Sequence, residues 1–278
     1  MRRPVCLILG ASLWVGACGG SGSTEPSARI DGAGVSIQLV APEGTPAESL
    51  DEAIGIIKTR VESMPGVTEA EIEWSGERNL TVSLTGEVDH QRAVDLIAVP
   101  GLLSLRPVLD QRDPTGSEEE SGGVERVDPD TGLTMTDHPS TSAWLASHAG
   151  NGVVDEVLLV GATSLTGAQI SEATPLFDST ADQWVIQLTF DSAGAGAFEA
   201  MTRESAQYDL YVDPRRRIAI VLDGVILSAP WVTSDEGITG GVAVITVSSQ
   251  QEAEDLSVKL RYGALPVAFE VLTVSTLD

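Results

Sequence analysis

The order of helix-like and strand-like hydrophobic patterns in residues 35–108 constrains the fold of this chain more than any other sequence feature. Residues 50–64 place apolar side chains three and four positions apart, which predicts one buried helical face that ends at Pro65-Gly66. Two later runs alternate apolar and polar side chains, which predicts a hairpin. The predicted elements are a strand at 35–40, a helix at 46–64, strands at 70–74 and 80–84, a helix at 89–97 and a strand at 102–108.

This order is that of the split βαβ, or ferredoxin-like, unit. In that unit two helices cover one face of a four-stranded antiparallel sheet. We therefore predict an α+β fold with a ferredoxin-like base, in which residues 102–108 form the last strand of the sheet.

A second set of patterns follows and predicts an additional α+β region. Asp223-Gly224 lies between two apolar runs and is the strongest short-range hairpin signal in the chain. Thr166 is a candidate cap for a short helix, and Asp191 or Ser192 for a longer one. The predicted elements are strands at 153–160, 184–190, 242–247 and 267–274, helices at 163–173, 192–201 and 249–260, and a hairpin at 218–227.

The charge balance excludes one class of partner. The chain has 41 Asp and Glu against 16 Lys and Arg, a net charge of -25, so nucleic acid is not an expected ligand and basic ligands are attracted unspecifically. Residues 109–149 carry nine acidic residues against two arginines and lose apolar periodicity, which predicts a mobile acidic insertion. Within them residues 128–132 resemble part of a calcium loop. Pro139 stands where the closing glutamate belongs, which favours a plain acidic loop.

The amino terminus has the three parts of an export signal. Arg2-Arg3 precede an apolar run shorter than the roughly 20 residues of a membrane-spanning helix. Val15-Gly16-Ala17-Cys18 then resembles the lipobox of bacterial lipoproteins, in which the cysteine receives a diacylglycerol. We predict a lipoprotein signal peptide at 1–17, a lipid anchor at Cys18 in a bacterial membrane, and a flexible tether at 18–29 on the extracytoplasmic side. The alternative is an ordinary cleaved signal with an incidental cysteine.

The sequence shows no assembled catalytic motif. His90, His138 and His148 are scattered and do not form a His-Glu-x-x-His arrangement. The chain also contains no Gly-x-Ser-x-Gly elbow and no phosphate-binding loop. We predict that the protein is not an enzyme and has no metal site and no cofactor.

Several motifs of the second half identify a family resemblance. They begin at Trp184 (WVIQLTFDSAG), Arg217 (RIAIVLDGVILSAP), Ile238 (ITGG) and Leu260 (LRYGALP), in that order. Together they resemble the extracytoplasmic P1 domain of the SecD and SecDF protein-export family. The resemblance implies a ferredoxin-like base at 30–108 and 249–278, the acidic insertion at 109–149, and an inserted α+β head at 150–248.

Members of this family use transmembrane helices to couple proton movement to polypeptide export, and this sequence shows none. We therefore expect no proton-driven motor. The resemblance implies instead a stand-alone lipoprotein that contacts exported polypeptides or components of the Sec translocon. Two alternatives stay open: an envelope module that binds a protein without an export role, and a lipoprotein that binds a solute or cation.

The hairpin at 218–227, with two flanking tryptophans, is the candidate binding site. Its backbone edges and apolar side chains suit an extended peptide that joins by strand addition. The alternative is that these side chains only fill the core. The candidate residues are Trp184, Ile218, Ile220, Asp223, Gly224, Ile226 and Trp231.

Overall fold

The computed structural model describes most of the chain after its first 33 residues. All described residues fall within one contact unit, residues 31–278. The predicted signal peptide, the tether, Cys18 and residues 128–132 lie outside them. The described ranges are 34–76, 78–113, 126–127, 134–135, 138–148, 154–163 and 165–277.

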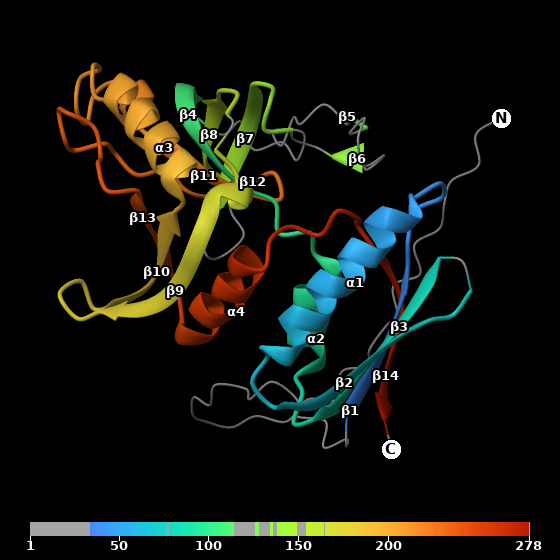
Figure 1. Ribbon diagram of the computed structural model, residues 1–278. Helices are drawn as coiled ribbons and strands as arrows, with labels where there is room; N and C mark the ends of the chain where they lie inside the picture. Colours follow the sequence, from blue (N-terminus) through green and yellow to red (C-terminus); the bar gives the residue numbers. More distant parts are fainter. Residues whose placement is uncertain are drawn as a thin grey trace, which may run out of the picture. The chain divides into compact units, whose positions relative to one another are not determined.

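Four antiparallel strands and two helices form the base (Figure 1). The strand order β14-β1-β3-β2 and the chain order of these elements are those of the ferredoxin-like fold, so the predicted α+β base is confirmed. The elements are β1 (Gly34–Val40), α1 (Ala47–Glu62), β2 (Val67–Trp74), β3 (Asn79–Gly86), α2 (His90–Ala98) and β14 (Glu270–Leu277).

The helices of the base form where the sequence predicts them, and for the same reasons. Helix α1 follows Pro46 and buries an apolar stripe against the inward side chains of β1 and β3. Helix α2 begins at Asp89, whose carboxylate accepts a hydrogen bond from the backbone N–H of Arg92 at 2.9 Å. A cap of this kind stabilises a helix by about 1 kcal/mol.

The prediction that residues 102–108 complete the base sheet is wrong. The strand there, β4, pairs with β11 and β8 in a closed barrel of order β11-β12-β7-β8-β4, and β14 takes its place in the base. The first half of β4 is buried on both faces, because Leu103 and Leu105 pack in the core shared with the three-stranded sheet and Val108 packs in the barrel core. The barrel strands are β4 (Leu103–Arg112), β7 (Ala143–His148), β8 (Val154–Val160), β11 (Ile218–Leu222) and β12 (Val225–Ser228).

The predicted acidic insertion at 109–149 is therefore partly ordered structure. Its first residues continue β4 and its last residues form β7, and both strands belong to the barrel. A further hairpin lies between them, β5 (Arg126–Val127) with β6 (Thr134–Met135).

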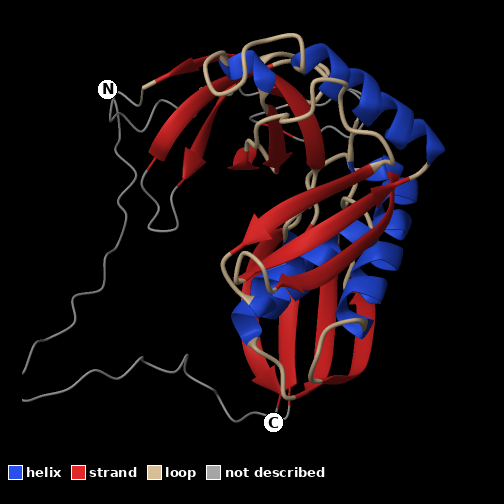
Figure 2. Ribbon diagram, turned by 90° about the vertical axis from the view of Figure 1, so that its left-hand side faces the viewer, coloured by secondary structure: helices blue, strands red, loops and turns tan. Residues whose placement is uncertain are grey.

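A three-stranded sheet of order β13-β10-β9 completes the head. Figure 2 shows it as adjacent arrows in the middle of the view, with helices behind them. Helix α4, which we assigned to the base, packs on this sheet, because its Ala253, Leu256 and Leu260 lie in the core of the head. The elements are β9 (Ile170–Asp178), β10 (Gln183–Phe190), α3 (Ser192–Ser205), β13 (Val242–Val247) and α4 (Gln250–Arg261).

Strand β9 stands where we predicted part of a helix at 163–173. Thr166 does cap a helix, but it is a single 3-10 turn, η2 (Gly167–Gln169), after which the chain becomes extended. Strand pairing accounts for the difference, because residues from Ile170 onward pair with β10 and leave room for only one helical turn after Thr166.

Candidate functional site

The β11–β12 hairpin closes around the predicted Asp-Gly turn. Asp223 and Gly224 have φ angles of 50° and 81°, the left-handed conformation that a two-residue type I′ turn requires. The Asp223 carboxylate also accepts hydrogen bonds from the backbone N–H groups of Gly101 and Leu102, at 3.0 and 2.8 Å. Burial raises the pKa of Asp223 above its ordinary value, although these two hydrogen bonds oppose the rise.

Neither strand of this hairpin offers the free edge that our peptide-binding prediction needs. Strand β11 lies between β4 and β12, and β12 pairs with β7 on its other side through Ile226 and Ser147. The closed barrel therefore argues against addition of a peptide to the hairpin itself, because both of its strands already pair with other barrel strands.

An apolar pocket of about 250 Å³ lies beside the hairpin. Its walls come from β4, β11, β13, helix α3, the segment after β12 and the loop before β13. A cavity of roughly 150 Å³ admits benzene, so this pocket has room for one aromatic or two branched aliphatic side chains. The lining residues are Leu105, Phe198, Thr202, Ile218, Ile220, Pro230, Trp231, Val232, Ile238, Val242, Ala243 and Val244.

Thr202 is the one hydroxyl-bearing residue in this lining, and its hydrogen bonds are already made. The hydroxyl donates to the carbonyl oxygen of Phe198 at 2.8 Å and accepts from the backbone N–H of Ile238 at 2.9 Å. The side-chain lining therefore favours hydrocarbon over a polar ligand.

Aromatic and cationic side chains extend one wall of the pocket toward solvent. Trp231 packs edge-on against Tyr211, with ring centroids 5.6 Å apart. Tyr211 is 66% exposed and has a φ of 60°, which is uncommon for a non-glycine residue. The guanidinium of Arg217 lies 5.6 Å from the centroid of the Trp231 ring and forms an ion pair with Glu156 at 2.6 Å. This cation–π contact helps to fix the position of the ring.

The seven residues that the sequence singled out occupy four places in the structure. Ile218, Ile220 and Trp231 line the pocket. Asp223 and Gly224 form the hairpin turn.

The other two candidates lie away from the pocket lining. Ile226 is buried in the barrel core. Trp184 packs against Phe177 on the neighbouring strand, with ring centroids 5.4 Å apart.

Sequence reasoning missed the helical wall and the β13 wall of the pocket. Phe198 and Thr202 sit one helical turn apart on α3, a spacing that indicates one face but not what that face lines. The strand of Val244 gave a stronger signal, because its sequence, VAVITV, contains no charged residue, but only the structure shows that Val244 itself is 48% exposed.

Two arginines hold the head against the base. Arg60 of α1 is fully buried and donates to the carbonyl oxygens of Leu96, Val99, Pro100 and Gly263 at 2.7 to 2.9 Å. Burial lowers the pKa of Arg60 to about 10, so it stays charged at neutral pH.

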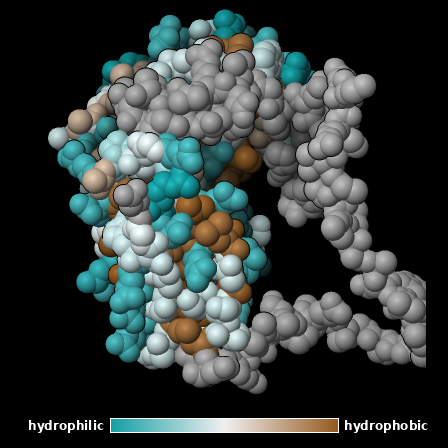
Figure 3. All heavy atoms as spheres, turned by 90° about the vertical axis from the view of Figure 1, so that its right-hand side faces the viewer, coloured by the Kyte–Doolittle hydropathy of each residue, from teal (hydrophilic) through white to brown (hydrophobic). Residues whose placement is uncertain are grey.

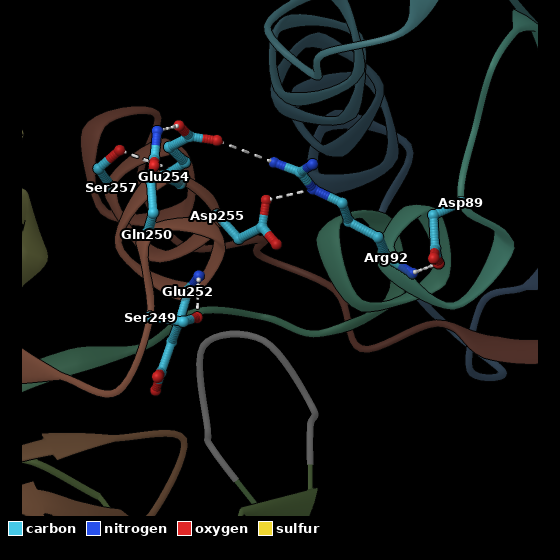
Figure 4. A network of polar contacts seen from close by, with 8 residues as sticks. All are labelled: Asp89, Arg92, Ser249, Gln250, Glu252, Glu254, Asp255 and Ser257. Atoms are coloured by element: carbon cyan, nitrogen blue, oxygen red, sulfur yellow. Dashed lines mark hydrogen bonds and ion pairs between the residues drawn. The ribbon is translucent and has the colours of Figure 1, made fainter. Parts of the chain in front are cut away.

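Arg92 of α2 makes the second connection, to α4. Its Nε donates to Asp255 at 2.6 Å, and its terminal nitrogen lies 3.6 Å from Glu254 (Figure 4). Burial raises the pKa of Asp255, and Arg92 opposes that rise. Figure 4 also shows Ser249 at the start of α4, where it accepts from the backbone N–H of Glu252.

The outward face of the base sheet differs from the pocket. Strand β2 exposes Glu69, Glu71 and Glu73 there. Figure 3 views the molecule from the side of β2 and β3 in Figure 1, and its surface is largely hydrophilic or neutral with separate hydrophobic patches. The apolar pocket of the head is therefore the better candidate for binding.

The described part of the chain shows neither a cluster of metal ligands nor a membrane-spanning helix. Within it, no three His, Cys, Asp or Glu side chains gather closely enough to hold a metal ion. None of its helices combines the length and the hydropathy needed to cross a membrane.

Two protein-family models match this chain. The model of the "SecDF, P1 head subdomain" matches residues 144–267, and that of the "Protein translocase subunit SecDF, P1 domain, N-terminal" matches residues 50–110. All of the pocket lining except Leu105 lies within the first match.

The relatives of this chain are protein translocase subunits of the same family. The chain is 30% identical to protein translocase subunit SecD of Syntrophobacter fumaroxidans, over 82% of this chain and 39% of that protein. It is 29% identical to protein translocase subunit SecDF of Thermus thermophilus, over 91% of this chain and 32% of that protein. The chain therefore spans only about two fifths or less of these relatives.

Solved structures agree with the sequence relatives. A crystal structure of SecDF in a super-membrane-facing form has a TM-score of 0.60 and 28% identity, over 87% of this chain and 30% of that one. A structure of SecDF, described as a membrane component that enhances protein export, has a TM-score of 0.58 and 26% identity. This second match covers 87% of this chain and 100% of that one.

Proposed function

This chain carries the P1 domain, base and head, of the SecD/SecDF protein-translocase family, and we propose that it binds extended polypeptides at the extracytoplasmic face of a membrane during protein export. The names of its relatives support an export-related role in general. The specific role in polypeptide binding is our inference from the head.

The apolar pocket beside β13 is the observation that carries this proposal. Its lining is mostly apolar, and the hydroxyl of Thr202 already has its hydrogen-bond partners. Burial of one valine, leucine or phenylalanine side chain contributes about 1.5–3 kcal/mol, which suits transient contact with a chain in transit. A pocket of this kind selects apolar side chains in general and does not read a defined sequence.

We propose further that the protein makes and breaks no covalent bond in this role. Binding and release of a polypeptide need no nucleophile, acid or base, and the motifs that would supply them are not recognisable in the sequence. The whole task then falls to the shape and polarity of the head.

Site-specific photocrosslinking in cells tests the binding proposal. A photoreactive residue in place of Val244, at the pocket, should capture exported polypeptides while they are being secreted. The matched control replaces Glu71, which is exposed on the outward face of the base sheet. Equal capture at both positions, or no capture at Val244, would refute the proposal. Capture of one folded envelope protein alone would support the binding module without an export role.

Lipid attachment at Cys18 is the second part of the proposed function. It would hold the P1 domain at the membrane through the residues that follow the lipobox-like segment. Metabolic labelling with a fatty acid should mark the wild-type protein and leave Cys18→Ala unlabelled. A label that persists in Cys18→Ala would exclude this site of attachment.

A further inference from the structure

Strand β13 has an edge that no described strand occupies. It forms one end of the β13-β10-β9 sheet and pairs only with β10. Val242, Ala243 and Val244 from this strand also line the pocket, so the free edge and the pocket adjoin each other.

The register shows which backbone groups of β13 face outward. The backbone N–H of Phe190 donates to the carbonyl of Gly241, and these residues stand in register with the pairs Leu188–Ala243 and Ile186–Ile245. In an antiparallel ladder, alternate residues point their N–H and C=O groups to opposite sides. The groups of 243, 245 and 247 therefore point to β10, and those of Val242, Val244 and Thr246 point away from it.

The opposite edge of the same sheet, strand β9, has features that prevent pairing with a further strand. The same alternation turns Ala173 and Pro175 of β9 outward. Pro175 has no N–H to donate, and the carbonyl of Ala173 already accepts a hydrogen bond from Arg261 at 2.9 Å. Natural edge strands use proline and charged side chains in this way to prevent pairing.

Strand β13 has no such feature to prevent pairing at its edge. Its sequence, VAVITV, contains neither proline nor a charged residue, and Val244 is 48% exposed. An unguarded edge beside an apolar pocket matches the two needs of an extended peptide, whose backbone pairs with the edge while alternate side chains are buried.

We propose that a polypeptide binds the head by adding an extended segment to the free edge of β13, with every second side chain directed into the pocket. The inference rests on the proposed function and specifies how that function is carried out. The net charge of -25 favours segments that carry positive charge between the apolar positions.

This mode of binding explains how one site accepts many sequences. Backbone hydrogen bonds can form with any extended chain. The mostly apolar lining requires only that the side chains at alternate positions are apolar. Three outward residues on β13 correspond to a segment of about five residues on the partner.

Alternate N-methylation of a synthetic peptide tests the inference on the full chain. The probe is a fluorescent peptide of about ten alternating valine and lysine residues, made with N-methyl groups on the valines or on the lysines. Only one of the two sets presents its N–H groups to β13, so methylation of that set should weaken binding by at least roughly tenfold. Methylation of the other set should leave the affinity within about twofold.

Amide hydrogen exchange gives a second readout that needs no variant. The unmodified peptide should slow exchange at Val244 and Thr246, whose N–H groups face the free edge. The N–H groups of Ala243 and Ile245 already point to β10 and should change less. Both measurements use the folded wild-type protein.

Two substitutions at one position supply a matched pair. Val244→Pro and Val244→Ala both remove the valine side chain, but only proline also removes the outward N–H. Val244→Pro should lose at least roughly tenfold more affinity than Val244→Ala. If Val244→Pro does not fold, the peptide series decides the question.

The outcomes separate this inference from the proposed function. Failure of every peptide to bind would overturn both. Equal binding of the two N-methylated peptides, without protection of Val244, would overturn strand addition and leave polypeptide binding intact. Protection of Val244 without peptide, together with a dimer in sedimentation, would show that a second copy of this chain occupies the edge and would overturn the proposal.

Discussion

Replacement of Arg60 by alanine is expected to destabilise the protein more than any surface substitution. The guanidinium is fully buried and donates to four backbone carbonyls, those of Leu96, Val99, Pro100 and Gly263. Arg60→Ala leaves all four without this donor in a site too enclosed to be rehydrated freely. A buried polar group left without its hydrogen-bond partner costs about 1–3 kcal/mol, so the loss of this donor from four carbonyls is expected to cost about 3–5 kcal/mol, a large share of the roughly 5–15 kcal/mol that stabilises a domain.

Urea unfolding measures this cost directly. Arg60→Ala should lower the midpoint and the extrapolated free energy of unfolding by about 3–5 kcal/mol. Arg60→Lys keeps the charge but not the planar five-donor fork, so it should fall between alanine and wild type. Lys58→Ala is the matched control, because Lys58 is 61% exposed and its pair with Glu62 is 3.9 Å long. It should change stability by less than about 0.5 kcal/mol.

A loss of less than about 1 kcal/mol in Arg60→Ala would contradict this reasoning. It would mean that water or neighbouring donors satisfy the four carbonyls once the guanidinium is gone. The segments around residues 100 and 263 would then be held by their other contacts.

Three further substitutions, one of them with a matched control, test the head and its turn. Burial raises the pKa of Asp223, so the folded state keeps a proton that the unfolded chain has already lost, and this contribution to stability disappears as pH rises through that window. Asp223→Asn should therefore flatten the pH dependence of urea unfolding between acid and neutral pH; an unchanged profile would contradict the assignment. Gly241→Ala should destabilise by more than about 1 kcal/mol in thermal unfolding, since its φ is 65° and the new Cβ would lie 2.5 Å from that of Ala195. Gly240→Ala, with a φ of 90° and no atom within 4 Å, should cost less, and equal losses would rule out the clash. Thr202→Val leaves a pocket-lining backbone N–H unpaired and should cost about 1–3 kcal/mol in urea unfolding; a neutral result would show that this N–H finds another partner.

The ferredoxin-like base could be predicted because its elements are local patterns. The spacing of the apolar side chains distinguishes helix from strand, and the order of the helices and strands identifies the ferredoxin-like unit. The patterns do not show which strands pair with one another. The apolar run of β4 follows α2 directly and suits either sheet, and only its pairing with β11 and β8 assigns it to the barrel.

The candidate site was predicted in part, for a related reason. Ile218, Ile220 and Trp231 line the pocket, and their strand-like pattern marked them in advance. The sequence led us to a different strand for the binding edge. It shows a strong hairpin signal, but it does not show that the strands of the hairpin pair with other strands of a closed barrel. The free edge belongs to β13, a short apolar strand that looks like ordinary core in the sequence.

The position of the insertion explains why so large a head is compatible with the base. The head interrupts the connection from α2 to β14, and the chain leaves and returns at neighbouring points, where the backbone N–H of Leu265 donates to the carbonyl of Pro100 at 2.8 Å. Because the entropy of closing a loop rises slowly with its length, a long insertion between adjacent ends costs the base little. The same two segments also carry carbonyls bound by Arg60, and the exit segment is bound by Asp223 of the head. Buried charges from both parts thus meet where the chain crosses, and the β13 edge remains free for other contacts.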